Sequence, residues 1–180
     1  MAKRLKKQDW ILHGFDVLRE QGHAGLKADR MVKHLGVSRG SFYWHFSDLQ
    51  TFHAELIAAW REQINIDVID ELKTLPDPKA QLRALIARVF AVSRPLERGM
   101  RMWAGANPEV QQVVHEVDRL RQGYVHTIFL ALGLPEPIAA SRAQMMMWAY
   151  VGHALSDERV ADPEARAADF THILTTPVES

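Results

Sequence analysis

The sequence predicts an all-α protein of about nine helices, and three observations favour this fold class. Apolar residues recur at three- and four-residue spacing along most of the chain, as on one face of an α-helix. Glycine and proline residues interrupt that pattern where helices are expected to begin or end. No strand candidate, repeat or low-complexity segment occurs among the 180 residues.

Composition and charge restrict the function classes. The chain has no cysteine, so disulfides and thiolate metal sites are excluded. The basic residues near the N-terminus are not followed by an apolar run, and no segment is apolar enough to span a membrane, so we expect a cytoplasmic protein. Residues 1–50 hold nine Lys and Arg against five Asp and Glu, whereas the remaining residues carry a net charge of −4. A basic first third suits nucleic-acid binding by a separate domain.

The first predicted helix covers residues 7–21. Ile11, Phe15 and Leu18 form its apolar stripe, and Gly22 ends it. Gly14 lies inside this helix, where glycine costs about 1 kcal/mol relative to alanine. We interpret it as room for a closely packed neighbouring helix.

Two short helices, at residues 28–34 and 38–44, are predicted around a tight turn. Gly36 lies where the first must end, and glycine accepts a left-handed conformation there without steric cost. Ser38 is a favourable N-cap for the second. Phe42 and Phe46 share one face and should pack on the first short helix. This pattern predicts a helix-turn-helix whose outer face carries hydrogen-bond donors.

The segment GVSRGSFYWHF at residues 36–46, with Gly22 before it, resembles the DNA-binding domain of TetR-family transcriptional repressors. The resemblance covers about residues 10–56. It implies a helix-turn-helix DNA-binding domain at residues 1–52 and a helical ligand-binding and dimerisation domain at residues 53–180. It also implies a repressor that is released from a palindromic operator by a small, largely apolar effector.

The residues that we expect to contact DNA lie in and before the second short helix. Arg39 is the best candidate for reading a base, because a guanidinium can bond guanine O6 and N7 together. Trp44 either presses on the sugar-phosphate backbone or a thymine methyl of the DNA, or packs against the next helix. The full expected set is Lys27, Ser38, Arg39, Gly40, Ser41, Tyr43, Trp44 and His45.

Three positions depart from the family pattern. Lys27 stands where the family has Thr or Ser, and it offers a charge to phosphate in place of a helix cap. Val32 stands where the family has Ala, so the two short helices could cross at a different angle. Leu49 replaces a Lys near the DNA backbone and removes one expected phosphate contact.

The remaining helices follow from apolar spacing and proline breaks. Asp48 can cap a long helix at residues 49–72, which continues from the DNA-binding domain into the second domain and ends before a Pro-bounded break at 74–78. Further helices are expected near residues 82–90, from 95, at 108–132, at 138–155 and at 163–174. Residues 145–151 are apolar on every side, more than one core-facing stripe needs. We therefore expect a homodimer through the last two helices, the arrangement that the resemblance also implies.

Methionine and aromatic residues concentrate in the second domain and could line a pocket or form plain core. The candidate ligand-binding residues are Phe90, Met100, Trp103, Tyr124, Met147 and Trp148. Arg101, Asp118 and Arg121 suggest a structural ion pair or network.

Other function classes have weaker support. His115 and His126 share a helix face, but no further ligand completes a zinc site. No nucleophile elbow, phosphate-binding glycine loop or carboxylate pair occurs, so we expect no enzyme, no catalytic residue and no cofactor. The remaining alternative is a TetR-shaped interaction protein that no longer reads DNA, for which Leu49 is the only support.

Overall fold

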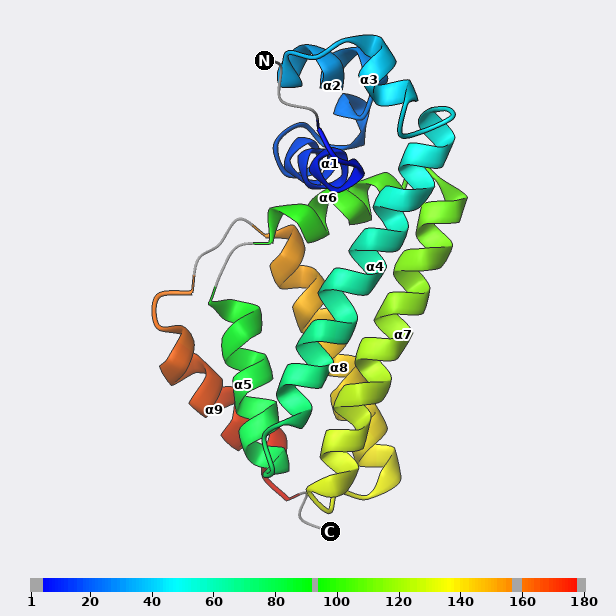
Figure 1. Cartoon of the computed structure of the whole chain (residues 1–180). Helices are drawn as coiled ribbons and strands as arrows, with labels where there is room; N and C mark the ends of the chain where they lie inside the picture. Colours follow the sequence, from blue (N-terminus) through cyan, green and yellow to red (C-terminus); the bar gives the residue numbers. More distant parts are fainter. Residues whose placement is uncertain (1–4, 92–93, 157–159, 178–180) are drawn as a thin grey trace. The chain divides into compact units, whose positions relative to one another are not determined.

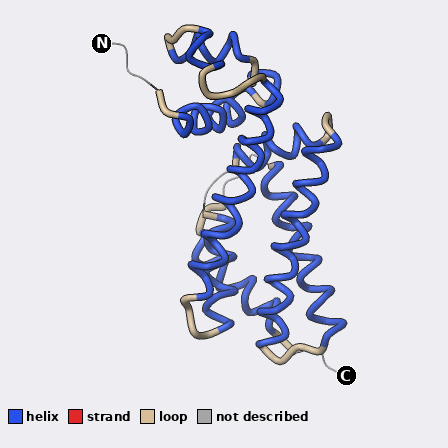
Figure 2. The backbone as a smooth tube through the Cα atoms, turned by 45° about the vertical axis from the view of Figure 1, so that its right-hand side comes forward, coloured by secondary structure: helices blue, strands red, loops and turns tan. Residues whose placement is uncertain are grey.

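The computed structural model describes residues 5–91, 94–156 and 160–177, with only the backbone given at 63–67. Every regular element in these residues is a helix (Figure 2), which confirms the predicted all-α fold class. The described residues form, in chain order (Figure 1), α1 (Lys7–Gln21), a 3₁₀-helix η1 (His23–Gly25), α2 (Ala28–Leu35), α3 (Arg39–Tyr43), α4 (Leu49–Lys73), α5 (Pro78–Phe90), α6 (Pro95–Ala104), α7 (Pro108–Ala131), α8 (Glu136–Leu155) and α9 (Pro163–Thr175).

The chain folds into two compact units, and each unit consists of two separate stretches of the sequence. The first consists of Met1–Gln63 with Pro95–Val114, and the second of Ile64–Arg94 with His115–Ser180. Helices α4 and α7 each contribute one end to either unit. These units differ from the predicted boundary after residue 52, which was drawn by expected function and stays a prediction.

Helix α6 belongs to the first unit because it packs directly on α1. A Cβ placed on Gly99 would lie 2.6 Å from the carbonyl oxygen of Leu18, so no larger residue fits at this crossing. The sequence had assigned α6 to the second domain. Its apolar spacing identifies a buried face but does not indicate which helix covers that face.

The core of the first unit is aromatic. Trp10 of α1 meets the edge of the Phe42 ring at a centroid distance of 5.4 Å. The Phe52 ring of α4 lies 5.0 Å from that of Phe46, and all four side chains are buried. A Cβ on Gly14 would come within 2.9 Å of side-chain atoms of Phe52 and Leu56, which confirms that this glycine gives room to a closely packed helix.

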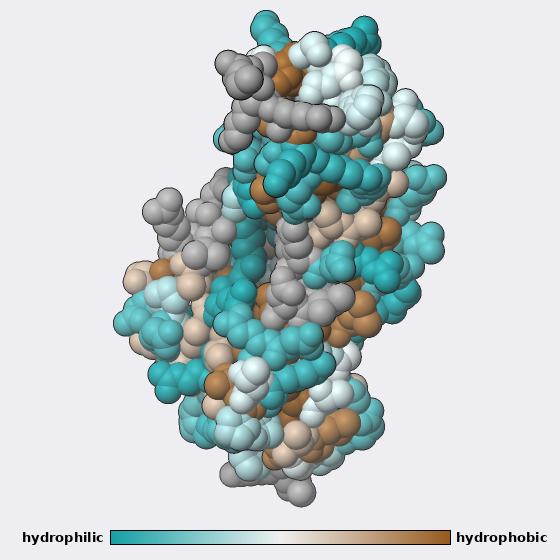
Figure 3. All heavy atoms as spheres, in the orientation of Figure 1, coloured by the Kyte–Doolittle hydropathy of each residue, from teal (hydrophilic) through white to brown (hydrophobic). Residues whose placement is uncertain are grey.

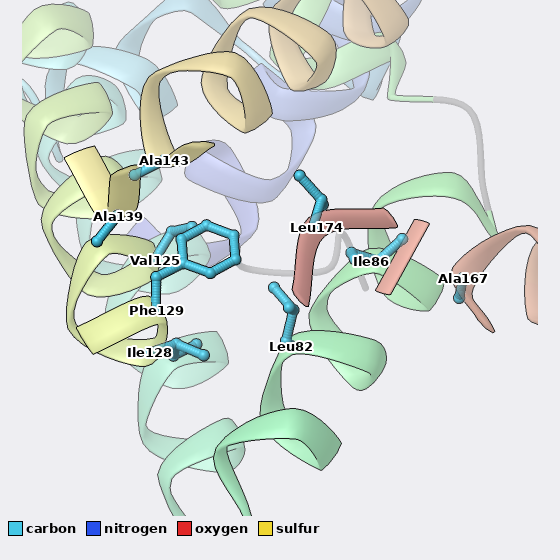
Figure 4. Close-up of a cluster of buried hydrophobic side chains, with 9 residues drawn as sticks. All are labelled: Leu82, Ile86, Val125, Ile128, Phe129, Ala139, Ala143, Ala167 and Leu174. Atoms are coloured by element: carbon cyan, nitrogen blue, oxygen red, sulfur yellow. The ribbon is translucent and has the colours of Figure 1, made fainter. Parts of the chain in front are cut away.

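The second unit has its own aliphatic core, to which α5, α7, α8 and α9 contribute. Leu82 of α5, Phe129 of α7 and Leu174 of α9 belong to one buried cluster, to which α8 adds Ala139 and Ala143 (Figure 4). Helices α5 and α9 run side by side (Figure 1). The small alanine side chains let the α8 backbone approach this core closely.

Side-chain caps fix where three helices begin. Asp48 accepts a hydrogen bond of 2.7 Å from the backbone N–H of Thr51, which confirms the predicted cap of α4. Asp77 and Asp162 accept equivalent bonds at the starts of α5 and α9, each followed by proline in the first turn. These caps satisfy N–H groups that have no partner within the helix.

The surface of both units is predominantly hydrophilic in the view of Figure 3, with hydrophobic patches between the charged side chains. Among the described helices, none combines the length and the apolar character that crossing a bilayer requires.

Candidate DNA-binding surface and ligand cavity

The turn between α2 and α3 is formed by the backbone. Gly36 has a φ of +64°, the left-handed conformation that was predicted for it. The N–H of Val37 donates to the carbonyl oxygen of Val32 at 3.1 Å and closes the end of α2. Ser38 occupies the N-cap position of α3 with an extended backbone, but its hydroxyl does not form the expected capping hydrogen bond.

The aromatic residues around α3 divide between core and surface. Phe42 and Phe46 are buried, but they pack against the rings of α1 and α4 rather than only on α2 as predicted. Tyr43 is 46% exposed and Trp44 is 73% exposed. The exposure of Trp44 excludes burial against α4, one of the two roles that the sequence left open.

The predicted DNA-contacting residues form an accessible surface over α3 and the turn before it. Ser38, Arg39 and Gly40 are exposed, and Ser41 is half-buried. Lys27 is also exposed, directly before α2, and its side chain makes no cap. The first unit therefore presents a guanidinium, an ammonium, hydroxyls and an indole around one short helix.

Arg39 makes an ion pair within this surface. Its Nε lies 2.9 Å from Oδ1 of Asp29 on α2, and both side chains are more than half exposed. Such exposed pairs contribute only about 0–1 kcal/mol, so solvent or another anion can replace the carboxylate at low cost. No sequence pattern pointed to Asp29, although its position in the first turn of α2 brings it near the start of α3.

His45, one of the residues expected to contact DNA, also has a neighbour within the protein. Its Nε2 lies 2.9 Å from the carbonyl oxygen of Leu5, in the segment that precedes α1. Nearby, Lys7 pairs with Glu55 of α4 at 2.6 Å. The first contact holds the segment before α1 beside the C-terminal end of α3, and the second joins the start of α1 to α4. No local sequence pattern indicates either role.

The sequence model for "Bacterial regulatory proteins, tetR family" matches residues 13–50, from α1 through the helix-turn-helix to the start of α4. The DNA-binding domain of this chain belongs to the TetR family. This match supports a transcriptional regulator with a DNA-binding helix-turn-helix, and the family is one of regulators and not of enzymes.

Comparisons along the whole chain agree with this family. The curated HTH-type transcriptional regulator AcrR of Shigella flexneri is 25% identical over 199 residues, covering 97% of this chain and 92% of that protein. The reduced form of Escherichia coli NemR has a similar fold, with a TM-score of 0.77 at 13% identity over 93% of this chain and 96% of that one. Bacillus subtilis FadR, solved with stearoyl-CoA, has a TM-score of 0.66 at 16% identity over 97% and 100%.

The second unit contains a cavity of about 340 Å³, lined mostly by apolar side chains of α4, α5, α7, α8 and α9. Phe90, Tyr124 and Met147, three of the six predicted ligand-binding residues, line it. Met100 and Trp103 lie in the first unit instead, and Trp148 projects from α8 with 69% of its surface exposed.

Polar residues of the cavity wall were missing from the predicted set. Arg88, Arg94, Arg121 and Tyr150 all line it. The guanidinium carbons of Arg94 and Arg121 lie 5.6 and 4.9 Å from the centroid of the Tyr150 ring. Of these, only Arg121 had a sequence signal, as part of a possible ion-pair network. It does pair with Asp118, at 3.6 Å, whereas Arg101 pairs with the buried Glu97 at 2.7 Å.

Trp103 packs in the first unit between two histidines. Its ring stacks on that of His23 and meets the His53 ring edge-on at 5.0 Å. Nε2 of His53 lies 3.1 Å from the carbonyl oxygen of Leu26. Burial lowers the pKa of His53, and the nearby charge of His23 lowers it further, against the raising effect of the Leu26 bond. This cluster is structural, and among the described residues no group of three or more His, Asp or Glu could hold a metal ion.

Helix α8 presents an apolar stripe to solvent. Met145 is 48% exposed and Trp148 69%, and Leu155 lies on the same face two turns further along. Ile173 adds a further exposed apolar side chain on α9. Exposed apolar side chains gathered on one helix face are typical of an interaction surface.

Proposed function

We propose that the chain is a repressor that binds a palindromic operator as a homodimer and leaves it when a small, largely apolar effector occupies the second unit. The observation that carries this proposal is the exposed, donor-rich surface of α3 in a DNA-binding domain of the TetR family. The dimer and the effector each rest on a further feature of the second unit.

The DNA-binding part of the proposal assigns base reading to Arg39. Released from the exposed carboxylate of Asp29, its guanidinium can donate two hydrogen bonds to guanine in the major groove. A good bidentate contact of this kind discriminates by about 1–3 kcal/mol against a wrong base, more than the surface ion pair contributes. The remaining residues, Lys27, Ser38, Gly40, Ser41, Tyr43, Trp44 and His45, would contact phosphate and sugar and fix the position of α3.

Arg39→Ala tests this role, with Arg19→Ala as the matched control. Arg19 is an exposed arginine of α1 that pairs with Asp16, so its removal changes charge and length equally but away from α3. Fluorescence anisotropy on a selected duplex should give a loss of about 1–3 kcal/mol for Arg39→Ala and relaxed preference at one base per half-site. Equal binding by both variants would remove Arg39 from the base-reading role.

The homodimer is proposed to form through α8 and α9. Met145, Trp148 and Leu155 lie on one face of α8, and two copies of that face would meet around a two-fold axis. A two-fold dimer presents two copies of α3, which is the symmetry of a palindromic site. Light scattering at micromolar concentration should give twice the chain mass, and a monomer would contradict the assignment.

The effector is proposed to bind in the cavity of the second unit. Met145, Met146 and Met147 form part of its wall, and methionine adapts to apolar ligands of varied shape. Met145 and Ile173 belong both to this wall and to the exposed apolar surface, so a ligand there would act on the interface as well.

Helix α4 is the proposed link between ligand and DNA. It begins after the helix-turn-helix at Leu49, and its later residues Val68, Ile69 and Leu72 line the cavity. The effector must bind more tightly to the state in which the two α3 helices no longer fit the operator, because otherwise it shifts nothing. A coupling of about 1–3 kcal/mol changes affinity roughly 5- to 150-fold. By reciprocity, the effector must bind the DNA-bound dimer more weakly by the same factor.

The second candidate is a TetR-shaped interaction protein that does not read DNA. Leu49 favours it, because this residue stands where the family has a lysine beside the DNA backbone. Absence of duplex binding at low salt, with the dimer intact, would support this candidate over the repressor.

A further inference from the structure

The cavity of the second unit has a charge imbalance. Three arginines, Arg88, Arg94 and Arg121, line it together with apolar and aromatic groups. None of its described lining residues is acidic. A guanidinium beside an apolar cavity is costly unless an anion or a set of acceptors compensates it.

Two of the three arginines have carboxylate partners outside the cavity lining. Arg88 forms an ion pair with Glu71 of α4. Arg121 lies 3.6 Å from Asp118, one turn earlier on α7. For Arg94 the described residues supply no carboxylate, and the partners recorded for it are two carbonyl oxygens and an aromatic ring. Within the described part of the chain, the lining therefore carries about one positive charge that no acidic side chain balances.

The backbone of α5 fixes the position of Arg94. Its Nε donates to the carbonyl oxygen of Val89 at 3.2 Å, and its Nη2 donates to that of Arg88 at 2.5 Å. These carbonyls belong to the last turn of α5, where cations are favoured. A guanidinium has five N–H donors, so three remain for another acceptor.

The ring of Tyr150 lies beside the side chains of both Arg94 and Arg121 in the cavity wall. The guanidinium groups of Arg94 and Arg121 both lie within 6 Å of its ring centroid. Each gains from the electron-rich ring, but the two positive charges repel one another. An anion beside the ring would relieve that repulsion and use the free donors of Arg94.

We propose that the cavity takes an amphiphile with a single anionic head, of the carboxylic acid class, with its carboxylate at Arg94 and Arg121 and its apolar body among the methionines and aromatics. This deepens the proposed function, because it names the chemistry of the effector and rests on the cavity being the effector site. One surplus positive charge calls for one negative charge, and most of the remaining wall is apolar. A guanidinium also pairs with a carboxylate in a planar, two-bonded geometry that neutral heads do not match.

The test is calorimetric titration of the full chain with decanoate, decanamide and decylamine, which share one tail and differ in head charge. Charge-assisted hydrogen bonds predict that decanoate binds about 10- to 100-fold more tightly than decanamide, with decylamine weakest. Equal or tighter binding of decanamide or decylamine would overturn the proposal, as would no binding of any of the three.

Substitutions test whether Arg94 causes the preference for decanoate over decanamide. Arg94→Gln should lose about 10- to 100-fold in decanoate affinity while decanamide affinity stays within about threefold. Arg94→Lys keeps the charge and should retain the preference for decanoate. Arg119→Gln removes an exposed arginine of α7 outside the cavity lining and should bind as the unaltered chain does. Unchanged decanoate binding in Arg94→Gln would overturn the proposal, and if circular dichroism finds this variant unfolded, Arg121→Gln is judged by the same criterion.

Duplex binding measured on the same samples separates this inference from the proposed function. If decanamide binds as well as decanoate and releases DNA, the repressor stands and the anion site falls. If decanoate binds with the predicted preference but no duplex is bound, the anion site stands and the repressor falls.

Discussion

Replacing Gly99 with alanine tests the packing of α6 on α1, which defines the first unit. The added Cβ would lie 2.6 Å from the Leu18 carbonyl oxygen and 3.2 Å from its carbonyl carbon. Both are backbone atoms of a residue within α1, so neither can move without displacing that helix. The clash can therefore be relieved only by separating the two helices.

The size of the effect follows from two opposing contributions. Alanine is favoured over glycine in a helix by about 1 kcal/mol, and overpacking costs typically 1–3 kcal/mol. Because the contact is with backbone, we expect the upper end of that cost and a net loss of about 1–2 kcal/mol. Gly123→Ala on α7 is the control, because a Cβ there meets nothing within 4 Å and only the helix gain of up to about 1 kcal/mol applies.

Thermal unfolding followed by circular dichroism, at matched protein concentration, measures both variants. For a chain of this size, Gly99→Ala should melt about 2–8 °C below the unaltered protein, and Gly123→Ala should melt slightly above it. If Gly99→Ala is as stable as Gly123→Ala, α6 does not pack on α1 as described, and the assignment of α6 to the first unit is wrong.

Three further perturbations probe the core, the interface and the DNA surface. Burial lowers the pKa of His53, so the unfolded chain binds a proton at this residue more readily than the folded chain does. The free energy of unfolding should therefore fall as the pH falls below about 6.5. Urea titrations between pH 7.5 and 5 should show that this free energy falls less steeply with pH in His53→Gln. Trp148→Glu places a charge in the exposed apolar stripe and should weaken dimerisation by about 2 kcal/mol or more, measured by sedimentation equilibrium; an unchanged dimer would exclude this face. Lys27→Ala should weaken all duplexes alike and lower the slope of log affinity against log salt by about one unit per half-site, and an unchanged slope would mean that Lys27 contacts no phosphate.

Local signals predicted much of the first unit. The left-handed turn at Gly36, the cap at Asp48 and the inward side of Phe42 each depend on a few neighbouring residues. Gly14 could be interpreted as a close-packing site because glycine is unfavourable inside a helix without such a reason.

The features that could not be predicted depend on contacts between residues that are far apart in the sequence. Met100 and Trp103 are of residue types that often line ligand pockets, but the packing of α6 on α1 places them in the first unit. Arg94 lies after the last turn of α5, and its place in the cavity wall depends on carbonyls of that turn and on Tyr150 from α8. The bond between His45 and the Leu5 carbonyl spans forty residues, beyond the range of any helical pattern.

Two copies of this chain are proposed to read a symmetric DNA site through α3. Selection of bound duplexes from a random library at low salt, followed by measurement of the mass of the complex, tests this proposal. We expect enrichment of an inverted repeat with half-sites about one helical turn apart or a multiple of it, bound by two chains or a multiple of two. Failure to enrich any sequence, while the protein remains a folded dimer, would refute DNA reading through α3 and favour the interaction protein.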